Sequence, residues 1–173
     1  MHDDPPRSWV TEFGDEGQEL RAERLALFYP EGWEAQVHAD PPRVTAILTG
    51  PGTSTAFVMV QLLGIPLPES ARAVVAQHSR AGVANGLVGG LDGPAQLERE
   101  EPTRATFLGA EHPGHHLIYG GTADGEEVSL AVDLFVAGLV DDTALLVVAS
   151  RDEDRDDAVN AFALVAASLT LDV

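Results

Sequence analysis

The first third of the chain alternates apolar and polar residues between short turn sequences. In "WEAQVH", Trp33, Ala35 and Val37 alternate with polar residues, which is the period of a strand with one buried face. Four segments of this kind predict strands: residues 24–29, 33–38, 43–50 and 55–64. The fourth is apolar on both faces, so we expect it in the middle of a covered sheet.

A helical period replaces the alternation after this fourth segment. The apolar stripe of a helix over residues 67–87 would contain five positions: Ala71, Val74, Val75, His78 and Gly82. His78 on this stripe is predicted to be a core residue. A glycine-rich stretch at 86–95 follows and predicts a flexible connector, since it lacks the lysine of a phosphate-binding loop.

A second helix is predicted at the C-terminal end. Its buried stripe would contain Ala158, Phe162, Val165, Ala166 and Leu169. Ser150 and Glu153 have the S-x-x-E spacing of a capping box, which predicts that this helix starts at Ser150. The acidic run "DEDRDD" suits the positive end of a helix dipole.

Between the two helices the pattern returns to strands. They are predicted at 103–111, 115–121, 127–139 and 143–150, with a hairpin turn at Asp124-Gly125. The last of these segments is apolar on both faces, so we expect it to be another central strand. Short turns between neighbouring strands favour antiparallel pairing. We therefore expect an α+β fold: an α/β/α sandwich with a mainly antiparallel sheet and two long helices. Residues 1–21 would be a polar tail and 22–173 a single domain.

The charge excludes several partners. All ten basic residues are arginine, against 28 acidic residues, for a net charge of −18. Such a chain repels phosphate backbones and anionic lipids, so we expect no nucleic-acid binding. It has no apolar run long enough for membrane insertion and no signal-peptide pattern at its start, which predicts a cytoplasmic protein. With no cysteine, disulfides and thiolate chemistry are excluded.

The stretch "EHPGHH" contains the only dense cluster of candidate ligands. His112, His115 and His116 are metal-ligand types, and Glu111 would add a carboxylate. Pro113-Gly114 interrupts any helix there, and on a strand His115 and His116 point to opposite faces. We therefore favour a bend at Pro113-Gly114 over a metal site, and expect no metal and no cofactor. No serine or cysteine nucleophile motif is present, which favours a protein that is not an enzyme.

The long strand at 127–139 has two unlike faces. The aliphatic face (Val128, Leu130, Val132, Leu134 and Val136) should lie under helices. The other face mixes small, acidic and aromatic residues: Ser129, Ala131, Asp133, Phe135 and Ala137. A buried core would not readily accept the carboxylate, so this second face predicts a surface that a partner protein or a second subunit covers.

One turn motif and the order of elements carry a family resemblance. "ALFYPEGWEAQ" resembles the entry strand, Pro-x-Gly-Trp turn and second strand of PsbP-like and Mog-type proteins, and "AASLTL" resembles the end of their terminal helix. The resemblance covers residues 22–171. It implies the α/β/α sandwich and a role in binding rather than catalysis, although no member's partner-binding residues can be placed here by motif.

Two functional hypotheses follow. The first is a non-enzymatic protein-binding or adaptor protein, whose partner is another protein or a second copy of the chain. The alternative is a small-ligand or metal-binding protein that uses His112, His115 and His116. An enzyme with scattered catalytic residues is the third and weakest interpretation.

Overall fold

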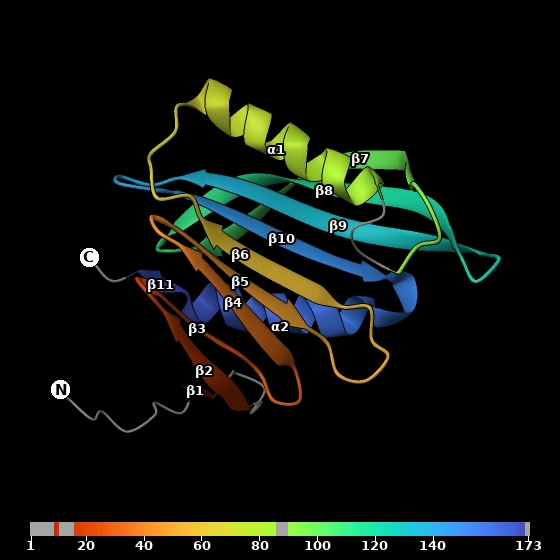
Figure 1. Cartoon of the computed structure of the whole chain (residues 1–173), viewed down its shortest axis with the longest axis horizontal. Coiled ribbons are helices and arrows are strands. Elements are labelled where there is room, and N and C mark those ends of the chain that lie inside the picture. Colours follow the sequence, from red (N-terminus) through yellow and green to blue (C-terminus); the bar gives the residue numbers. More distant parts are fainter. Residues whose placement is uncertain (1–8, 11–15, 86–89, 172–173) are drawn as a thin grey trace.

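The computed structural model describes residues 9–10, 16–85 and 90–171 (Figure 1). The strands in this part of the chain are β1 (Trp9–Val10), β2 (Glu16–Ala22), β3 (Leu25–Pro30), β4 (Glu34–Asp40), β5 (Arg43–Thr49), β6 (Phe57–Leu62), β7 (Gln96–Phe107), β8 (Ala110–Ala123), β9 (Glu126–Gly138), β10 (Thr143–Arg151) and β11 (Thr170–Leu171). The helices are α1 (Glu69–Ala84) and α2 (Arg155–Ser168), the latter preceded by a short 3-10 turn, η1 (Asp152–Asp154).

The strands form two antiparallel sheets. The larger has seven strands in the order β4-β5-β6-β10-β9-β8-β7, and the smaller has four in the order β1-β2-β3-β11. Strands β6 and β10 lie in the interior of the larger sheet, as predicted from their two apolar faces, although β6 is only partly covered on one of its faces. The hairpin turn at Asp124-Gly125 is also confirmed, with φ values of 53° and 79°.

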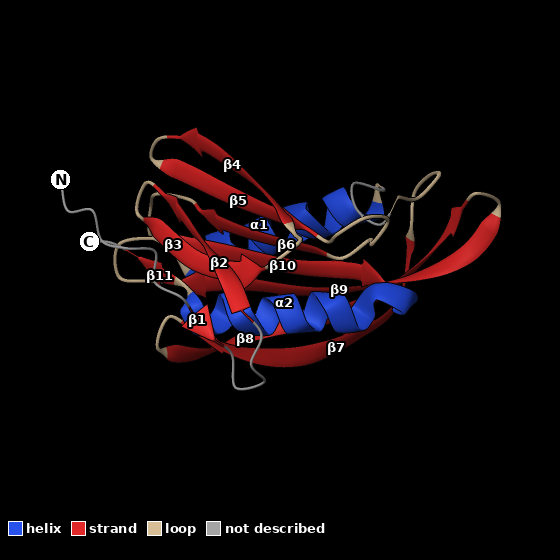
Figure 2. Cartoon of the chain, turned by 90° about the horizontal axis from the view of Figure 1, so that it is seen from below, coloured by secondary structure: helices blue, strands red, loops and turns tan. Residues whose placement is uncertain are grey.

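The two helices lie on opposite faces of the larger sheet. Helix α1 packs against β9 on one face, and α2 packs against β10 on the other while also contacting β3 of the small sheet. Figure 2 shows α2 crossing the sheet beside β2 and β3. The helix is therefore covered on two sides, and both Leu164 and Ala161 are buried.

The predicted α/β/α sandwich is wrong, because the fold is β-rich and contains a second sheet. Residues 16–21 of the predicted tail lie in β2, which pairs with β3 from Gly17↔Pro30 to Ala22↔Leu25. A Cβ on Gly17 would lie 2.9 Å from Leu164 Cδ2, so glycine lets this strand approach α2 closely. The remainder of the predicted tail, apart from β1, lies outside the described residues.

The region read as one strand at 103–111 is a hairpin. Strand β7 ends at Phe107, and the chain turns at Leu108 and Gly109, whose φ values are 51° and 77°. Apolar side chains on both sides of the turn concealed it, because leucine seldom adopts positive φ. The connector predicted at 86–95 falls partly on residues 86–89, which lie outside the described residues.

The capping box predicted at Ser150 is absent. Ser150 lies inside β10, paired with Ala131 of β9, and α2 begins only at Arg155. Asp154 precedes the helix and accepts hydrogen bonds from Thr55 N (2.8 Å) and Thr55 Oγ1 (2.6 Å). Sheet pairing therefore extends past the serine, and the local S-x-x-E pattern has no effect.

We expect Ser150→Ala to change the free energy of unfolding by less than about 0.5 kcal/mol, or to stabilise slightly, because the removed hydroxyl makes no hydrogen bond. Ser150 is 0% exposed, and its Oγ has no hydrogen-bond partner among the described residues. The matched control is Ser168→Ala. Ser168 Oγ donates to Leu164 O (2.7 Å) and accepts from Phe28 N (2.9 Å), so its loss should destabilise by about 1 kcal/mol or more. Urea unfolding of both variants tests this; a loss of about 1 kcal/mol in Ser150→Ala would restore the capping interpretation.

Candidate binding surfaces

Helix α1 leaves part of its sheet face uncovered. It packs on β9, while β5 and β6 carry the same face of the sheet farther from the helix. We call this region the open face and define it by six residues of β5 and β6: Thr45, Ile47, Thr49, Phe57, Met59 and Gln61. Thr49 is exposed, Thr45 is buried, and the other four are half-buried. None of the six is charged, in a chain with a net charge of −18.

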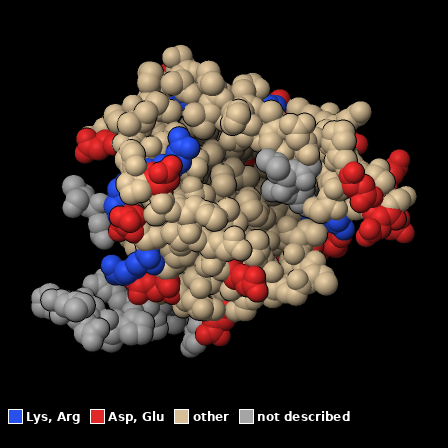
Figure 3. All heavy atoms as spheres, in the orientation of Figure 1, with Lys and Arg blue, Asp and Glu red and all other residues tan. Residues whose placement is uncertain are grey.

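The open face is apolar in its middle and only partly shielded. Ile47 is paired with Met59 across the two strands, and both side chains are half-buried. Gln61 Nε2 donates a 2.9 Å hydrogen bond to Thr45 Oγ1, which satisfies the polar groups at one end. In Figure 3 the charged residues gather toward the rim of this view, and the middle is largely uncharged and hollowed. An uncharged, half-exposed sheet surface of this kind is typical of interaction sites.

Helix α1 buries little of its own surface against the sheet. Val83 is the only residue of the helix that is fully buried. The predicted apolar stripe is wrong at Val74, which is 68% exposed, and His78, predicted to be a core residue, is exposed as well. The side of the helix that faces the sheet instead carries Val75, Ala76 and Val83. The helix therefore directs a different face toward the sheet from the one that the spacing of apolar residues predicted.

A cleft lies on the other side of α1, above β7 and β8. Its volume is about 500 Å³, which is within the range of small-ligand pockets. We call it the α1 cleft; its lining residues are Glu69, Arg72, Ala73, Ala76, Glu100, Pro102, Pro113, Gly114, His115 and Val136. Alanine, proline, glycine and valine make its surface largely apolar, and the charged groups lie among them.

Ionic contacts connect α1 to β7 and β8 along this cleft. Arg80 Nη2 donates to Glu100 Oε2 at 2.7 Å, and His115 Nδ1 lies 3.4 Å from Glu100 Oε1. The hydrogen bond from Arg80 lowers the pKa of the Glu100 carboxyl below its usual range. Burial raises the pKa of the nearby Tyr119 hydroxyl. These residues hold the helix in place above the strands, and sequence spacing alone did not indicate that they meet.

The stretch "EHPGHH" does not form a bend. All six residues lie in β8, which stays paired with β7 through Pro113↔Arg104 and His116↔Glu101. Strand β9 pairs with β8 only from Gly114 onward. Pro113 therefore has a neighbouring strand on one side only, where a missing N–H is tolerated. The predicted bend is wrong.

The three histidines have separate surroundings. His112 stacks on Phe107 with ring centroids 4.3 Å apart, and its Nε2 lies 3.2 Å from the backbone oxygen of the same phenylalanine. His115 faces the α1 cleft, whereas His116 contacts Asp133 on the α2 side. Within the described residues no three metal-ligand side chains converge. Alternation along a strand explains the separation of the adjacent pair.

Asp133 ties the sheet to the start of α2. Its Oδ1 lies 2.6 Å from His116 Nδ1, and its Oδ2 accepts a 2.7 Å hydrogen bond from Arg155 Nη2. The aspartate side chain is 15% exposed. The carboxylate on this face is therefore accounted for by internal partners, which the strand pattern did not reveal.

The surface predicted around Phe135 is not exposed. Phe135 and Ala131 are 2% and 3% exposed, because α2 covers this face of β9. The Phe135 ring stacks on Phe162 of α2 at 5.6 Å and meets Phe107 edge-on at 6.0 Å. Ser129 lies at the distal end of the same face and is half-buried. The aliphatic face of β9 does lie under α1, as predicted.

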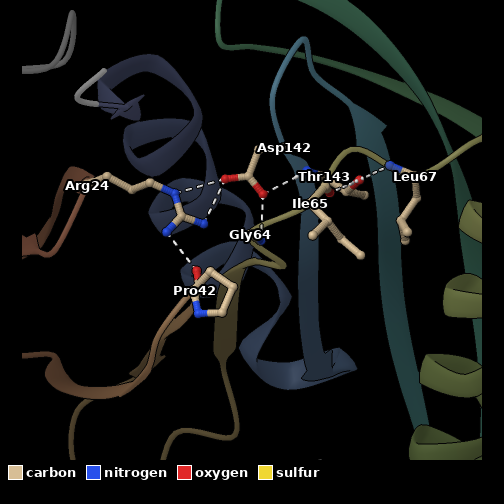
Figure 4. A network of polar contacts seen from close by, with 7 residues as sticks. All are labelled: Arg24, Pro42, Gly64, Ile65, Leu67, Asp142 and Thr143. Atoms are coloured by element: carbon tan, nitrogen blue, oxygen red, sulfur yellow. Dashed lines mark hydrogen bonds and ion pairs between the residues drawn. The ribbon is translucent and has the colours of Figure 1, made fainter.

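A further ion pair, between Arg24 and Asp142, connects the start of β10 to two other segments (Figure 4). Arg24 donates to Asp142 Oδ2 from Nε (2.9 Å) and to Pro42 O from Nη1 (2.7 Å). The other aspartate oxygen, Oδ1, accepts from Gly64 N and Thr143 N, both at 2.8 Å. Residues far apart in sequence thus share one carboxylate, which holds the β6–α1 connection against the main sheet.

Comparison with known proteins found similarity in fold only. No family model and no curated protein matches the chain. A crystal structure from Bacteroides thetaiotaomicron VPI-5482 is similar with a TM-score of 0.51 and 10% identity. The match covers 91% of this chain but 49% of that one, so the present chain spans about half its length. At this identity the likeness concerns the fold alone.

A second structure is more weakly similar. It is LpqN of Mycobacterium tuberculosis, described as involved in cell envelope biogenesis, with a TM-score of 0.42, 16% identity, and coverage of 99% and 94% of the two chains. Neither structure is described as a PsbP-like or Mog-type protein, so that resemblance stays a prediction. Among the described residues, no helix combines the length and apolar character that crossing a membrane requires.

Proposed function

We propose that the chain is a non-enzymatic binding protein that recognises another protein on the open face. The observation that carries this proposal is the absence of charge from Thr45, Ile47, Thr49, Phe57, Met59 and Gln61 on a strongly acidic molecule. Excess negative charge keeps the rest of the surface solvated and repels other acidic surfaces. An uncharged region with half-buried apolar side chains lowers the cost of desolvation on association.

The polar clusters support binding more than catalysis. The Glu100 carboxylate is engaged by Arg80, and both oxygens of Asp133 are engaged by His116 and Arg155. Groups held in ion pairs in this way serve to position elements. Among the described residues, no serine or threonine hydroxyl is hydrogen-bonded to a histidine, the arrangement that activates a hydroxyl nucleophile.

The test is partner capture from native extract by immobilised chain and by variants with one charge on the open face. Ile47→Glu and Thr49→Glu should each reduce the recovery of the principal partner about tenfold, because an introduced carboxylate must be desolvated on binding. Thr49 is exposed, so this variant tests the surface without disturbing the core.

The matched control is Val74→Glu, which places the same charge on the outer side of α1, where Val74 is 68% exposed. It should retain the partner. Equal recovery by the wild-type chain, both open-face variants and the control, with unchanged melting temperatures, would contradict the proposed function.

A further inference from the structure

The two edges of the larger sheet are protected very differently. Edge strand β7 contains Pro102, a register shift between Leu97 and Arg99, and a dense set of charges: Glu98, Arg99, Glu100, Glu101 and Arg104. Proline, bulges and charged side chains are the means by which proteins prevent an edge strand from pairing with another chain. These features disfavour the pairing of β7 with another chain.

Edge strand β4 lacks proline and any register shift, and its acidic residues, Glu34 and Asp40, stand only at its two ends. Its sequence, "EAQVHAD", contains no proline, glycine, lysine or arginine, and its register with β5 runs without a shift from Glu34↔Thr49 to Asp40↔Arg43. Within the described residues β4 pairs with β5 only, and Figure 2 shows it at the free end of the sheet. Val37, in the middle of the strand, is 42% exposed. Its outer backbone groups form a regular template for an added strand.

The charges on β4 indicate which kind of strand can pair with it. Glu34 and Asp40 lie at the two ends of β4 on the same side as the open face, and both are exposed. Neither forms an ion pair with any described residue. An incoming strand with basic residues opposite these two positions would neutralise both, since directly opposed unlike charges stabilise strand pairs.

A second copy of the chain fits this edge poorly. Antiparallel self-pairing centred on Val37 would place Glu34 of each copy opposite Asp40 of the other. Two like-charge pairs would then face each other across the new ladder, on chains that already carry a net charge of −18 each.

We propose that β4 accepts an extended, basic segment of a partner protein as an eighth strand of the sheet. The segment has two basic residues six positions apart, opposite Glu34 and Asp40, with small polar residues between them on that side and apolar residues on the other. Its polar side continues the surface of the open face. The inference rests on the proposed protein-binding function and supplies the chemistry of the partner.

The probe is a labelled heptapeptide, Lys-Val-Thr-Val-Thr-Val-Lys, titrated with the full chain and followed by fluorescence anisotropy. A peptide in which proline replaces each valine has the same charge but cannot complete a strand. We expect the valine peptide to bind at least about tenfold more tightly, because backbone pairing adds to charge attraction. Glu34→Gln combined with Asp40→Asn should weaken binding and reduce its dependence on salt.

Two matched lysine substitutions locate the site. Val37→Lys on β4 should weaken the valine peptide about tenfold, whereas Leu97→Lys on β7 should leave its affinity within about twofold, since lysine blocks pairing only at the edge where it stands. The exposed fractions of the two native residues are 42% and 44%, so both variants add one positive charge to a similarly exposed position. Unchanged melting temperatures exclude misfolding.

Three results would overturn the inference: equal affinity for the proline peptide, equal weakening by the two lysine variants, or concentration-dependent dimers that Val37→Lys abolishes. The peptide titration tests the edge alone. Partner capture by the variants Ile47→Glu and Thr49→Glu tests the proposed function alone, so failure of one is distinguishable from failure of the other.

Discussion

Asp142→Ala should destabilise the protein by about 3 kcal/mol, because removing one partner of a buried ion pair leaves the other charge poorly solvated. The Asp142 side chain is 8% exposed and that of Arg24 is 29% exposed, so the arginine keeps some contact with water and the lower part of the usual range applies. The substitution also removes the acceptor of two backbone N–H groups, those of Gly64 and Thr143.

The measurement is urea unfolding, with Asp141→Ala as the matched control. Asp141 precedes Asp142 in the sequence but is exposed, so its removal should change the free energy of unfolding by less than about 0.5 kcal/mol. Asp142→Asn keeps the size of the side chain and one acceptor oxygen but removes the charge, so its stability should lie between those of the two alanine variants. Similar stabilities for the two alanine variants would contradict the network as described.

Phe135→Ala should destabilise by about 4 kcal/mol, as expected for deletion of a large aromatic side chain from a packed core. The ring is 2% exposed and packs between Phe162 and Phe107. The ring also requires glycine at position 114 of β8, because a Cβ there would lie 2.3 Å from Phe135 Cδ1. The close backbone approach and the ring are therefore one packing unit.

Thermal and urea unfolding measure the effect, and Val74→Ala provides the control. Val74 is 68% exposed, so its truncation should change the free energy of unfolding by less than about 0.5 kcal/mol. A folded Phe135→Ala variant with a loss below about 1 kcal/mol would show that this side chain lies at a surface, as the strand pattern alone had predicted.

The candidate surfaces were largely invisible to sequence reasoning. Half of the open face, Phe57, Met59 and Gln61, belongs to β6, which the sequence pattern assigned to a covered sheet. An apolar pattern indicates that these residues tolerate burial. How far they are actually buried depends on which strands α1 covers. Among the three predicted histidines, only His115 reaches the α1 cleft.

The sequence by itself determined the strands with clear alternation, the antiparallel pairing through short turns, the two helices and the central positions of β6 and β10. These features depend on local periodicity and turn chemistry, which neighbouring residues carry. The tertiary structure alone decided that β2 joins a second sheet, that α2 lies over Phe135, and that Asp133 and Asp142 are satisfied by arginines distant in sequence. The reason is that burial and ion pairing depend on contacts between distant segments, and a single sequence does not specify which segments meet.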